Sequence, residues 1–240
     1  IFRPTLDKLV RETPEAILLV EFGEDDNEEN LRRLRQLKDL IGDLGFHWNN
    51  SGAKWGGVAE VLNPELQAAI TDVRTSGLNI MMSMKDEGKP VSFVEDCAVP
   101  LEHLAEYTQR LTDVFEKHGT RGTWYAHASV GCLHVRPVLN LRLDKDVKAM
   151  RAIAEEAFAM VREYKGSHSG EHGDGIVRSE FHTFMYGERL VSAFEDVKDR
   201  FMGRFTVHHV LSRERHEAPQ SGMCHEVEGP GAPAGGSPPA

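Results

Sequence analysis

The clearest indication of the fold is the stretch Thr123-Trp-Tyr-Ala-His127-Ala-Ser-Val-Gly-Cys-Leu-His134-Val-Arg-Pro-Val-Leu-Asn-Leu141. Residues 123–127 predict a strand, the Ser-Val-Gly segment predicts a tight turn, and residues 134–141 predict the partner strand. The two histidines then lie at facing ends of a β-hairpin. That spacing would let both imidazole rings reach one ion.

Imidazoles and a carboxylate gather again in Gly166-Ser-His168-Ser-Gly-Glu171-His172-Gly-Asp-Gly175. Neutral imidazole and carboxylate are ordinary ligands for zinc, manganese or ferrous iron, and two histidines with one carboxylate leave positions open for a substrate. We predict that His127, His134 and Glu171 hold one divalent metal ion. Neighbouring side chains diverge, so His172 is expected to stay free as a base. From the residue types alone, His127 and His134 could equally be ordinary surface histidines.

The composition narrows the class of protein. The formal charge of −10 argues against a nucleic-acid partner, because phosphates would be repelled. An apolar content of 40% suffices for a packed core, and no apolar run reaches the length of a membrane span. Three cysteines without a C-x-x-C pair indicate neither a disulfide framework nor a cluster site. We therefore expect a cytoplasmic setting, with membrane association only through a partner.

Strands and helices alternate loosely around the hairpin. The continuous apolar run 16–22 predicts a buried strand, and leucines at helical spacing up to Gly45 predict a helix after it. His168 is interpreted as an ordinary loop residue. Together the patterns predict an α+β fold with an antiparallel sheet covered by helices on one side. The other expected elements are a strand at 91–100 and helices at 5–11, 65–77, 100–119, 144–166, 176–181 and 187–201.

The two histidine-bearing stretches resemble the motifs of a known family. These are the FAD-linked oxidases of the vanillyl-alcohol oxidase type, specifically the C-terminal domain of the glycolate oxidase, D-lactate dehydrogenase and D-2-hydroxyglutarate dehydrogenase group. The family segments H-x-G-D-G-N-L-H and S-G-E-H-G-[IDV]-G read here as 127–134 and 169–175. The resemblance runs from about Glu15 to Phe201. Val130 and Cys132 depart from the family's Asp and Asn.

The resemblance implies a domain organisation. Residues 1–201 would form one ferredoxin-like substrate- and metal-binding domain, and the N-terminal FAD-binding domain would precede residue 1. The resemblance to the family ends at residue 201, and the Gly- and Pro-rich tail 202–240 is expected to be disordered. An iron–sulfur domain or another electron acceptor is an expected partner, and a homodimer is left open.

The resemblance also implies an activity. The whole protein would oxidise a D-2-hydroxy acid of the lactate, glycolate or 2-hydroxyglutarate class, with hydride transfer to FAD and a divalent metal polarising the substrate. His172 would be the general base, and Glu171-His172-Gly173 would form an edge of the flavin pocket. Arg74 and Arg136 would bind substrate carboxylate, because guanidinium pairs with carboxylate in two hydrogen bonds. Alternatively, Arg74 is an exposed helical arginine and Arg136 forms a salt bridge at the rim.

Two other classes of function remain open on the sequence. One is a metal-dependent hydrolase that uses the same three ligands and an activated water. The other is a non-catalytic structural cap or dimerisation module. The isolated chain is expected neither to hold FAD tightly nor to turn over substrate, because it contains no G-x-G-x-x-G phosphate cradle.

Overall fold

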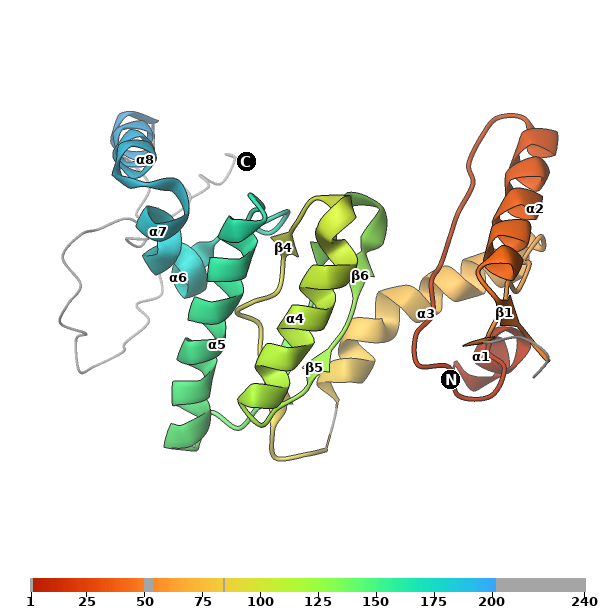
Figure 1. Cartoon of the computed structure of the whole chain (residues 1–240), viewed down its shortest axis with the longest axis horizontal. Coiled ribbons are helices and arrows are strands. Elements are labelled where there is room, and N and C mark those ends of the chain that lie inside the picture. Colours follow the sequence, from red (N-terminus) through yellow and green to blue (C-terminus); the bar gives the residue numbers. More distant parts are fainter. Residues whose placement is uncertain (1, 50–53, 84, 202–240) are drawn as a thin grey trace, which may run out of the picture. The chain divides into compact units, whose positions relative to one another are not determined.

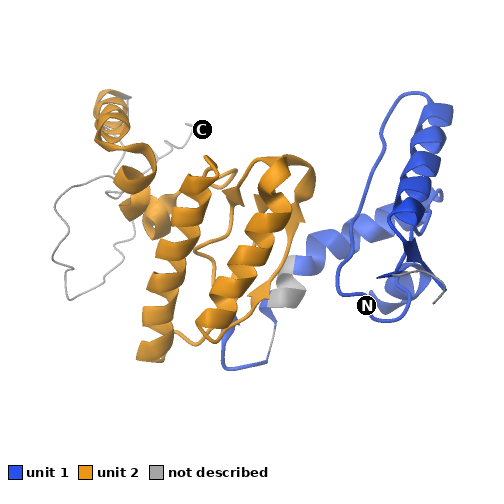
Figure 2. Ribbon diagram, in the orientation of Figure 1, with its two compact units in different colours: residues 1–89 blue, residues 90–240 orange. Residues whose placement is uncertain are grey.

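The structure, a computed structural model, describes residues 2–49, 54–83 and 85–201 of the 240-residue chain. The chain divides into two compact units, residues 1–89 and residues 90–240 (Figure 2). The tail predicted from residue 202 lies outside the described residues. Among the helices that the structure describes, none combines the length and the apolar character that crossing a membrane requires.

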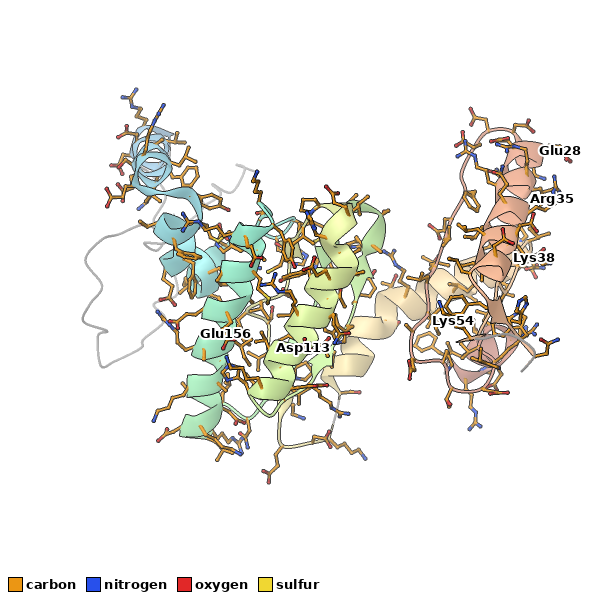
Figure 3. All side chains as sticks on the ribbon, viewed as in Figure 1. Glu28, Arg35, Lys38, Lys54, Asp113 and Glu156 are labelled. Carbon is orange, nitrogen blue, oxygen red and sulfur yellow. The ribbon has the colours of Figure 1, made fainter. Side chains whose placement is uncertain are left out.

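The first unit is mainly helical (Figure 1). The helix predicted after the acidic turn is confirmed: the side chain of Asp26 accepts the N–H of Glu28 at its start, and Gly45, with φ +87°, follows its end. Its basic residues Arg35 and Lys38 are exposed, as predicted (Figure 3). The elements of this unit are α1 (Arg3–Leu9), α2 (Asn27–Asp43), α3 (Pro64–Met82) and the short parallel strands β1 (Phe46–His47) and β2 (Lys54–Trp55).

The prediction of a buried strand at 16–22 is wrong. This segment has no regular secondary structure, and Ile17 and Leu18 are 64% and 76% exposed. An apolar run becomes a strand only where a neighbouring strand pairs with its backbone. Within the described residues no strand pairs with this run, and the local pattern could not reveal that.

Two short antiparallel sheets form the centre of the second unit. Their strand orders are β3-β8-β5 and β4-β7-β6. The predicted hairpin is confirmed, with Ala126 opposite Leu133 and His127 opposite Cys132. The α+β class is also confirmed, although the antiparallel strands divide between two sheets and the strand expected at 91–100 shortens to β4. The strands are β3 (Lys89–Pro90), β4 (Cys97–Ala98), β5 (Gly122–Thr123), β6 (Ala126–His127), β7 (Cys132–Leu133) and β8 (Arg136–Leu139).

Helices α4 (Leu104–Lys117) and α5 (Asp144–Glu163) lie side by side (Figure 1). Their inward faces and the sheet residues form one apolar core, in which Tyr107, Phe115 and Phe158 are at most 1% exposed. Both helices were predicted from apolar side chains at helical spacing. This core fixes the positions of the two sheets and of the loops between their strands.

The segment after α5 returns to the sheet. Ser167 forms an isolated antiparallel bridge with Ala98 of β4, so the loop 166–175 begins beside that strand. Gly166 is needed at this approach, because a Cβ there would lie 2.2 Å from the Ala98 carbonyl oxygen. The chain then continues through α6 (Gly175–Arg178), the 3-10 turn η3 (Ser179–Phe181), α7 (His182–Tyr186) and α8 (Glu188–Phe201), close to the predicted helices 176–181 and 187–201.

Candidate functional site

The structure brings His127, His134 and Glu171 together in the second unit. The Glu171 Oε2 atom lies 3.7 Å from His127 Nε2 and 3.4 Å from His134 Nε2. One ligand atom from each residue falls within 4.8 Å of the others. The two imidazole rings are 5.0 Å apart and nearly perpendicular. Their role as metal ligands stays a prediction, and the geometry meets its main requirement.

The hairpin explains how two histidines seven positions apart meet. His127 ends β6, and the N–H of His134 donates to the Tyr125 carbonyl across the ladder at 2.7 Å. Gly131 closes the turn with φ +70°, and a Cβ there would lie 2.1 Å from the Val99 carbonyl oxygen. The turn therefore needs glycine for both its conformation and its close packing.

Asp96 holds the loop that carries Glu171 and His172. Its carboxylate accepts the N–H of Glu171 at 2.9 Å, the N–H of His172 at 2.8 Å and the hydroxyl of Ser169 at 3.1 Å. Asp96 is fully buried and has φ +74°, a conformation that non-glycine residues rarely adopt. The sequence pattern predicted only a strand at this position and did not indicate the role of Asp96. An acidic pair before a short strand was the available signal.

The electrostatics of Asp96 agree with that role. Burial alone would raise its pKa, but the N–H groups of His172 and Glu171 and the hydroxyl of Ser169 outweigh burial and lower the pKa. The carboxylate therefore stays ionised at neutral pH. It is occupied by these donors, which makes it a support for the loop and a poor candidate for a ligand.

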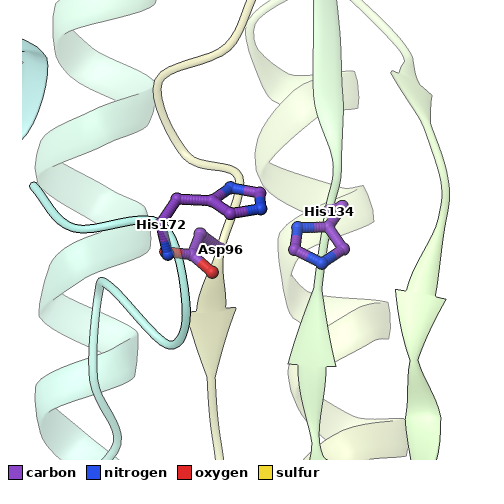
Figure 4. Close-up of side chains that lie close together, drawn as sticks. All are labelled: Asp96, His134 and His172. Atoms are coloured by element: carbon purple, nitrogen blue, oxygen red, sulfur yellow. The ribbon is translucent and has the colours of Figure 1, made fainter. Parts of the chain in front are cut away.

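His172 stacks on His134, with ring centroids 4.8 Å apart and an interplanar angle of 20° (Figure 4). Its Nδ1 atom lies 3.5 Å from Glu95 Oε1, and its side chain is 47% exposed. An exposed imidazole beside a possible metal centre and oriented by a carboxylate is suited to proton transfer. The predicted base thus lies next to the three candidate ligands.

His134 is well suited to bind a cation. Burial lowers its pKa, and the neighbouring His172 lowers it further, so the ring is neutral at neutral pH. Its Nδ1 atom is buried without a hydrogen-bond partner among the described residues. The Nε2 atom lies 3.4 Å from Glu171 Oε2 and is the ring nitrogen placed to bind a cation. The donor set therefore fits a divalent metal.

Other sets of nearby donors are weaker. Asp96, Cys132 and Glu171 also converge, as do Asp96, His134 and His172. Burial and the negative charge of Asp96 raise the pKa of Cys132 to about 12, which disfavours the thiolate that binds metal. Because backbone N–H groups already occupy Asp96, the set of His127, His134 and Glu171 is the best supported.

Arg136 forms a salt bridge, the predicted alternative to substrate binding. Its Nε donates to Glu95 Oε2 at 2.7 Å, and both side chains are mostly buried. Burial alone would raise the pKa of Glu95, but hydrogen bonds from Ser92 and Arg136 outweigh it and lower the pKa. Glu95 therefore links Arg136 to His172. A substrate contact by Arg136 stays a prediction.

The remaining predicted residues take different places. Arg74 lies on α3 in the first unit, so its substrate contact stays a prediction. Gly173 has φ +75°, and its carbonyl accepts a hydrogen bond from Arg178. Its place at a flavin edge also stays a prediction. His168, interpreted as an ordinary loop residue, is in the loop but fully buried, which its sequence context did not indicate.

Comparison with known proteins finds a family whose sequence model matches this chain. A sequence model of the family described as "FAD linked oxidases, C-terminal domain" matches residues 4–201. The chain is 35% identical over 172 residues to a D-2-hydroxyglutarate dehydrogenase of Haemophilus influenzae, covering 72% of this chain and 16% of the relative.

Two further relatives agree with that match. The identity is 30% over 185 residues to the D-2-hydroxyglutarate dehydrogenase of Pantoea ananatis, covering 76% of this chain and 18% of the relative. It is 24% over 133 residues to the glycolate oxidase subunit GlcD of Bacillus subtilis, covering 55% and 27%. The chain therefore spans less than a fifth of the two dehydrogenases.

Proposed function

The chain belongs to the family of C-terminal domains of FAD-linked oxidases, and we propose that it is the substrate- and metal-binding part of an FAD-dependent D-2-hydroxy-acid dehydrogenase. The observation that carries the proposal is the convergence of His127, His134 and Glu171 beside the ring of His172. The names of the relatives favour 2-hydroxyglutarate or a similar acid as the substrate.

The proposed reaction removes two groups from the substrate carbinol. The hydroxyl proton goes to His172, and the hydride from the α-carbon goes to FAD, which leaves the 2-oxo acid. A 2-hydroxy acid gives up its hydroxyl proton reluctantly. A divalent ion held by His127, His134 and Glu171 would supply Lewis acidity that lowers the pKa of that hydroxyl. His172 is free to accept the proton because it has no ligand role in this set.

Glu95 has two tasks in this proposal. It orients His172 through the 3.5 Å approach to Nδ1, and it holds Arg136 at the edge of the same site. A substrate carboxylate would compete with Glu95 for the guanidinium of Arg136, since both are planar anions that suit its donor geometry. Exchange of this partner would couple substrate binding to the orientation of the base.

Metal binding tests the proposal first. The purified chain is freed of metal and titrated with Mn²⁺ or Zn²⁺, and bound metal is measured after dialysis. We expect His134→Ala to lose one metal ion per chain relative to the unmodified chain, and His47→Ala, which alters an exposed histidine of the first unit, to lose none. Equal metal content in the His134→Ala chain would contradict the proposed centre.

Substrate binding tests the second part of the proposal, which is the role of Arg136. Isothermal titration of the metal-loaded chain with D-2-hydroxyglutarate should give binding that weakens at least tenfold in Arg136→Met, because about 1.4 kcal/mol is lost with a charge-assisted contact. The L enantiomer is the control for the shape of the site. Equal binding of both enantiomers, or no effect of Arg136→Met, would contradict the assignment.

A further inference from the structure

A second group of metal-binding side chains lies outside the candidate site. His168 comes from the loop 166–175, Asp174 precedes α6, and His182 begins α7. His168 Nε2 lies 3.1 Å from Asp174 Oδ1, and His182 Nε2 lies 2.7 Å from Asp174 Oδ2. One ligand atom from each residue falls within 4.8 Å of the others. None of the three belongs to the set of His127, His134 and Glu171.

These side chains are buried and only partly satisfied. The side chains of His168, Asp174 and His182 are 0%, 16% and 10% exposed. Within the described part of the chain, three of their buried atoms form no well-aligned hydrogen bond: His168 Nε2 and Asp174 Oδ1, which lie 3.1 Å from each other, and His182 Nδ1. A buried polar atom without a partner costs about 1–3 kcal/mol. A network built only for hydrogen bonding would leave fewer such atoms.

The spacing suits a small divalent cation. Ligands that bind zinc tetrahedrally at about 2.0–2.1 Å are themselves about 3.3 Å apart. The 3.1 Å between His168 Nε2 and Asp174 Oδ1 is close to that value. One ion between these two atoms would satisfy both at once. Two imidazoles with a carboxylate are a donor set that zinc accepts readily.

The surroundings are those of a closed structural centre. Phe158 packs edge-on against the His168 ring at 5.2 Å, and Phe194 lies 6.2 Å from the ring of His182. The Tyr186 hydroxyl lies 3.4 Å from His168 Nδ1, on the side of the ring away from Nε2. A polar group on the second nitrogen orients a ligand imidazole. Apolar neighbours limit water and strengthen the attraction between an ion and its ligands.

The charges are compatible with a cation. Burial lowers the pKa of His168, so the ring is neutral and offers a lone pair. Burial alone would raise the pKa of Asp174, but His182 and His168 outweigh it, so Asp174 stays ionised. Arg178 brings a positive charge nearby, and its guanidinium donates to the carbonyls of Glu95 and Gly173 and lies 3.7 Å from Asp96. These contacts partly neutralise the positive charge of Arg178.

We propose that His168, Asp174 and His182 form a second zinc site, structural in role, that ties α7 to the loop carrying Glu171 and His172. Three protein ligands are identified, and the second Asp174 oxygen or a water completes the coordination. The site would hold the loop from its far end, while Asp96 holds it from the sheet. It is independent of the substrate proposed above.

Zinc counting with matched variants tests this inference. The full chain carries histidines at 208, 209, 216 and 225 that could bind zinc by themselves. The reference protein therefore has all four replaced by glutamine. Zinc-loaded reference chain is compared with His182→Gln, Asp174→Asn and His134→Ala in the same background, by elemental analysis after gel filtration.

We expect His182→Gln and Asp174→Asn each to remove one zinc ion per chain relative to the reference, and His134→Ala to remove a different one. The double variant of His182 and His134 should lose both. The zinc-dependent rise in melting temperature should shrink in Asp174→Asn, which is nearly isosteric and therefore expected to fold. Zinc content equal to the reference in both His182→Gln and Asp174→Asn would overturn the inference, whatever His134→Ala shows.

Discussion

At the level of single residues, one buried carboxylate orders the loop of the candidate site. Asp96 accepts three hydrogen bonds from residues 169–172, and its backbone carbonyl accepts the N–H of Gly170 at 2.7 Å. The positive φ of Asp96 is a strained backbone conformation for a residue other than glycine. The loop conformation and the placement of Glu171 therefore depend on a residue 75 positions away in the sequence.

Replacing Asp96 should weaken metal binding more than a comparable surface change. Asp96→Asn keeps the shape but turns one acceptor into a donor facing an N–H group. We expect metal affinity to fall about 10–100-fold, as for other residues that support ligands. Stability should fall by about 1–3 kcal/mol, because buried donors lose their acceptor. Competition with a metal-sensitive dye measures the first and urea unfolding the second.

The control for this prediction is Asp113→Asn on α4, where the carboxylate accepts a hydrogen bond from Gln109 at an exposed position. It should change neither quantity appreciably. Equal metal affinity in Asp96→Asn and the unmodified chain would contradict the role assigned to Asp96.

Two glycines with the same backbone conformation allow the cost of backbone strain to be measured apart from the cost of a steric clash. Gly131 and Gly119 have φ values of +70° and +69°, but only at Gly131 would an added Cβ meet another atom within 4 Å, the Val99 oxygen at 2.1 Å. Gly131→Ala should therefore destabilise the chain clearly more than Gly119→Ala, whose cost is about 1 kcal/mol. Thermal unfolding of both variants measures the difference, and equal losses would contradict the clash.

At the level of elements, α4 and α5 are joined by an apolar face and by a polar contact at its edge. Glu156 on α5 accepts from Lys117 at 2.9 Å and lies 2.8 Å from His118 Nε2 (Figure 3 labels Glu156). The hydrogen bond with His118, followed by that with Lys117, lowers the pKa of Glu156. A carboxyl with a lowered folded pKa stabilises the fold above its unfolded pKa.

The stability of Glu156→Gln should consequently depend on pH. Near neutral pH the variant should be less stable by about 0.5 kcal/mol, a small value because the pair is partly exposed. The difference should disappear as the pH falls below about 4.3 and through the lowered folded pKa, since Glu156 is then protonated in both states. Urea unfolding at several pH values measures it, and a difference that grows with acid would contradict the sign.

At the level of the whole molecule, the core and the candidate site belong to one unit. The buried apolar cluster and its packed neighbours lie between Val91 and Met185, and the three candidate ligands lie in the same unit. In the first unit α1 and α2 contain no buried residue. The two units therefore differ in how much apolar surface stabilises each of them.

A chain of residues 90–240 should accordingly fold without residues 1–89. We expect cooperative thermal unfolding and the same metal stoichiometry per chain as the full protein, because every candidate ligand is retained. The same fragment carrying His134→Ala serves as the control for metal binding. A fragment that is unfolded by circular dichroism, or that binds no metal, would show that the first unit is required.

The amino-acid sequence was enough to identify the donor side chains of the two histidine-bearing stretches, the hairpin within the first of them and the helices with a regular apolar stripe. These depend on local spacing, which is visible along the chain. It also indicated the family, because motif residues are read position by position. Local spacing failed at 16–22, where an apolar run has no strand to pair with among the described residues.

The residues that support the site became apparent only in the folded chain. The hold of Asp96 on the Glu171 loop, the Glu95 link between Arg136 and His172, and the burial of His168 beside Asp174 and His182 all depend on packing. Asp96 and Glu95 act on residues far along the chain, and His168 packs against Phe158 of the helix before it and Tyr186 of a helix after it. Such contacts leave no periodic signal, because they depend on where the core places each segment and not on the order of neighbouring residues.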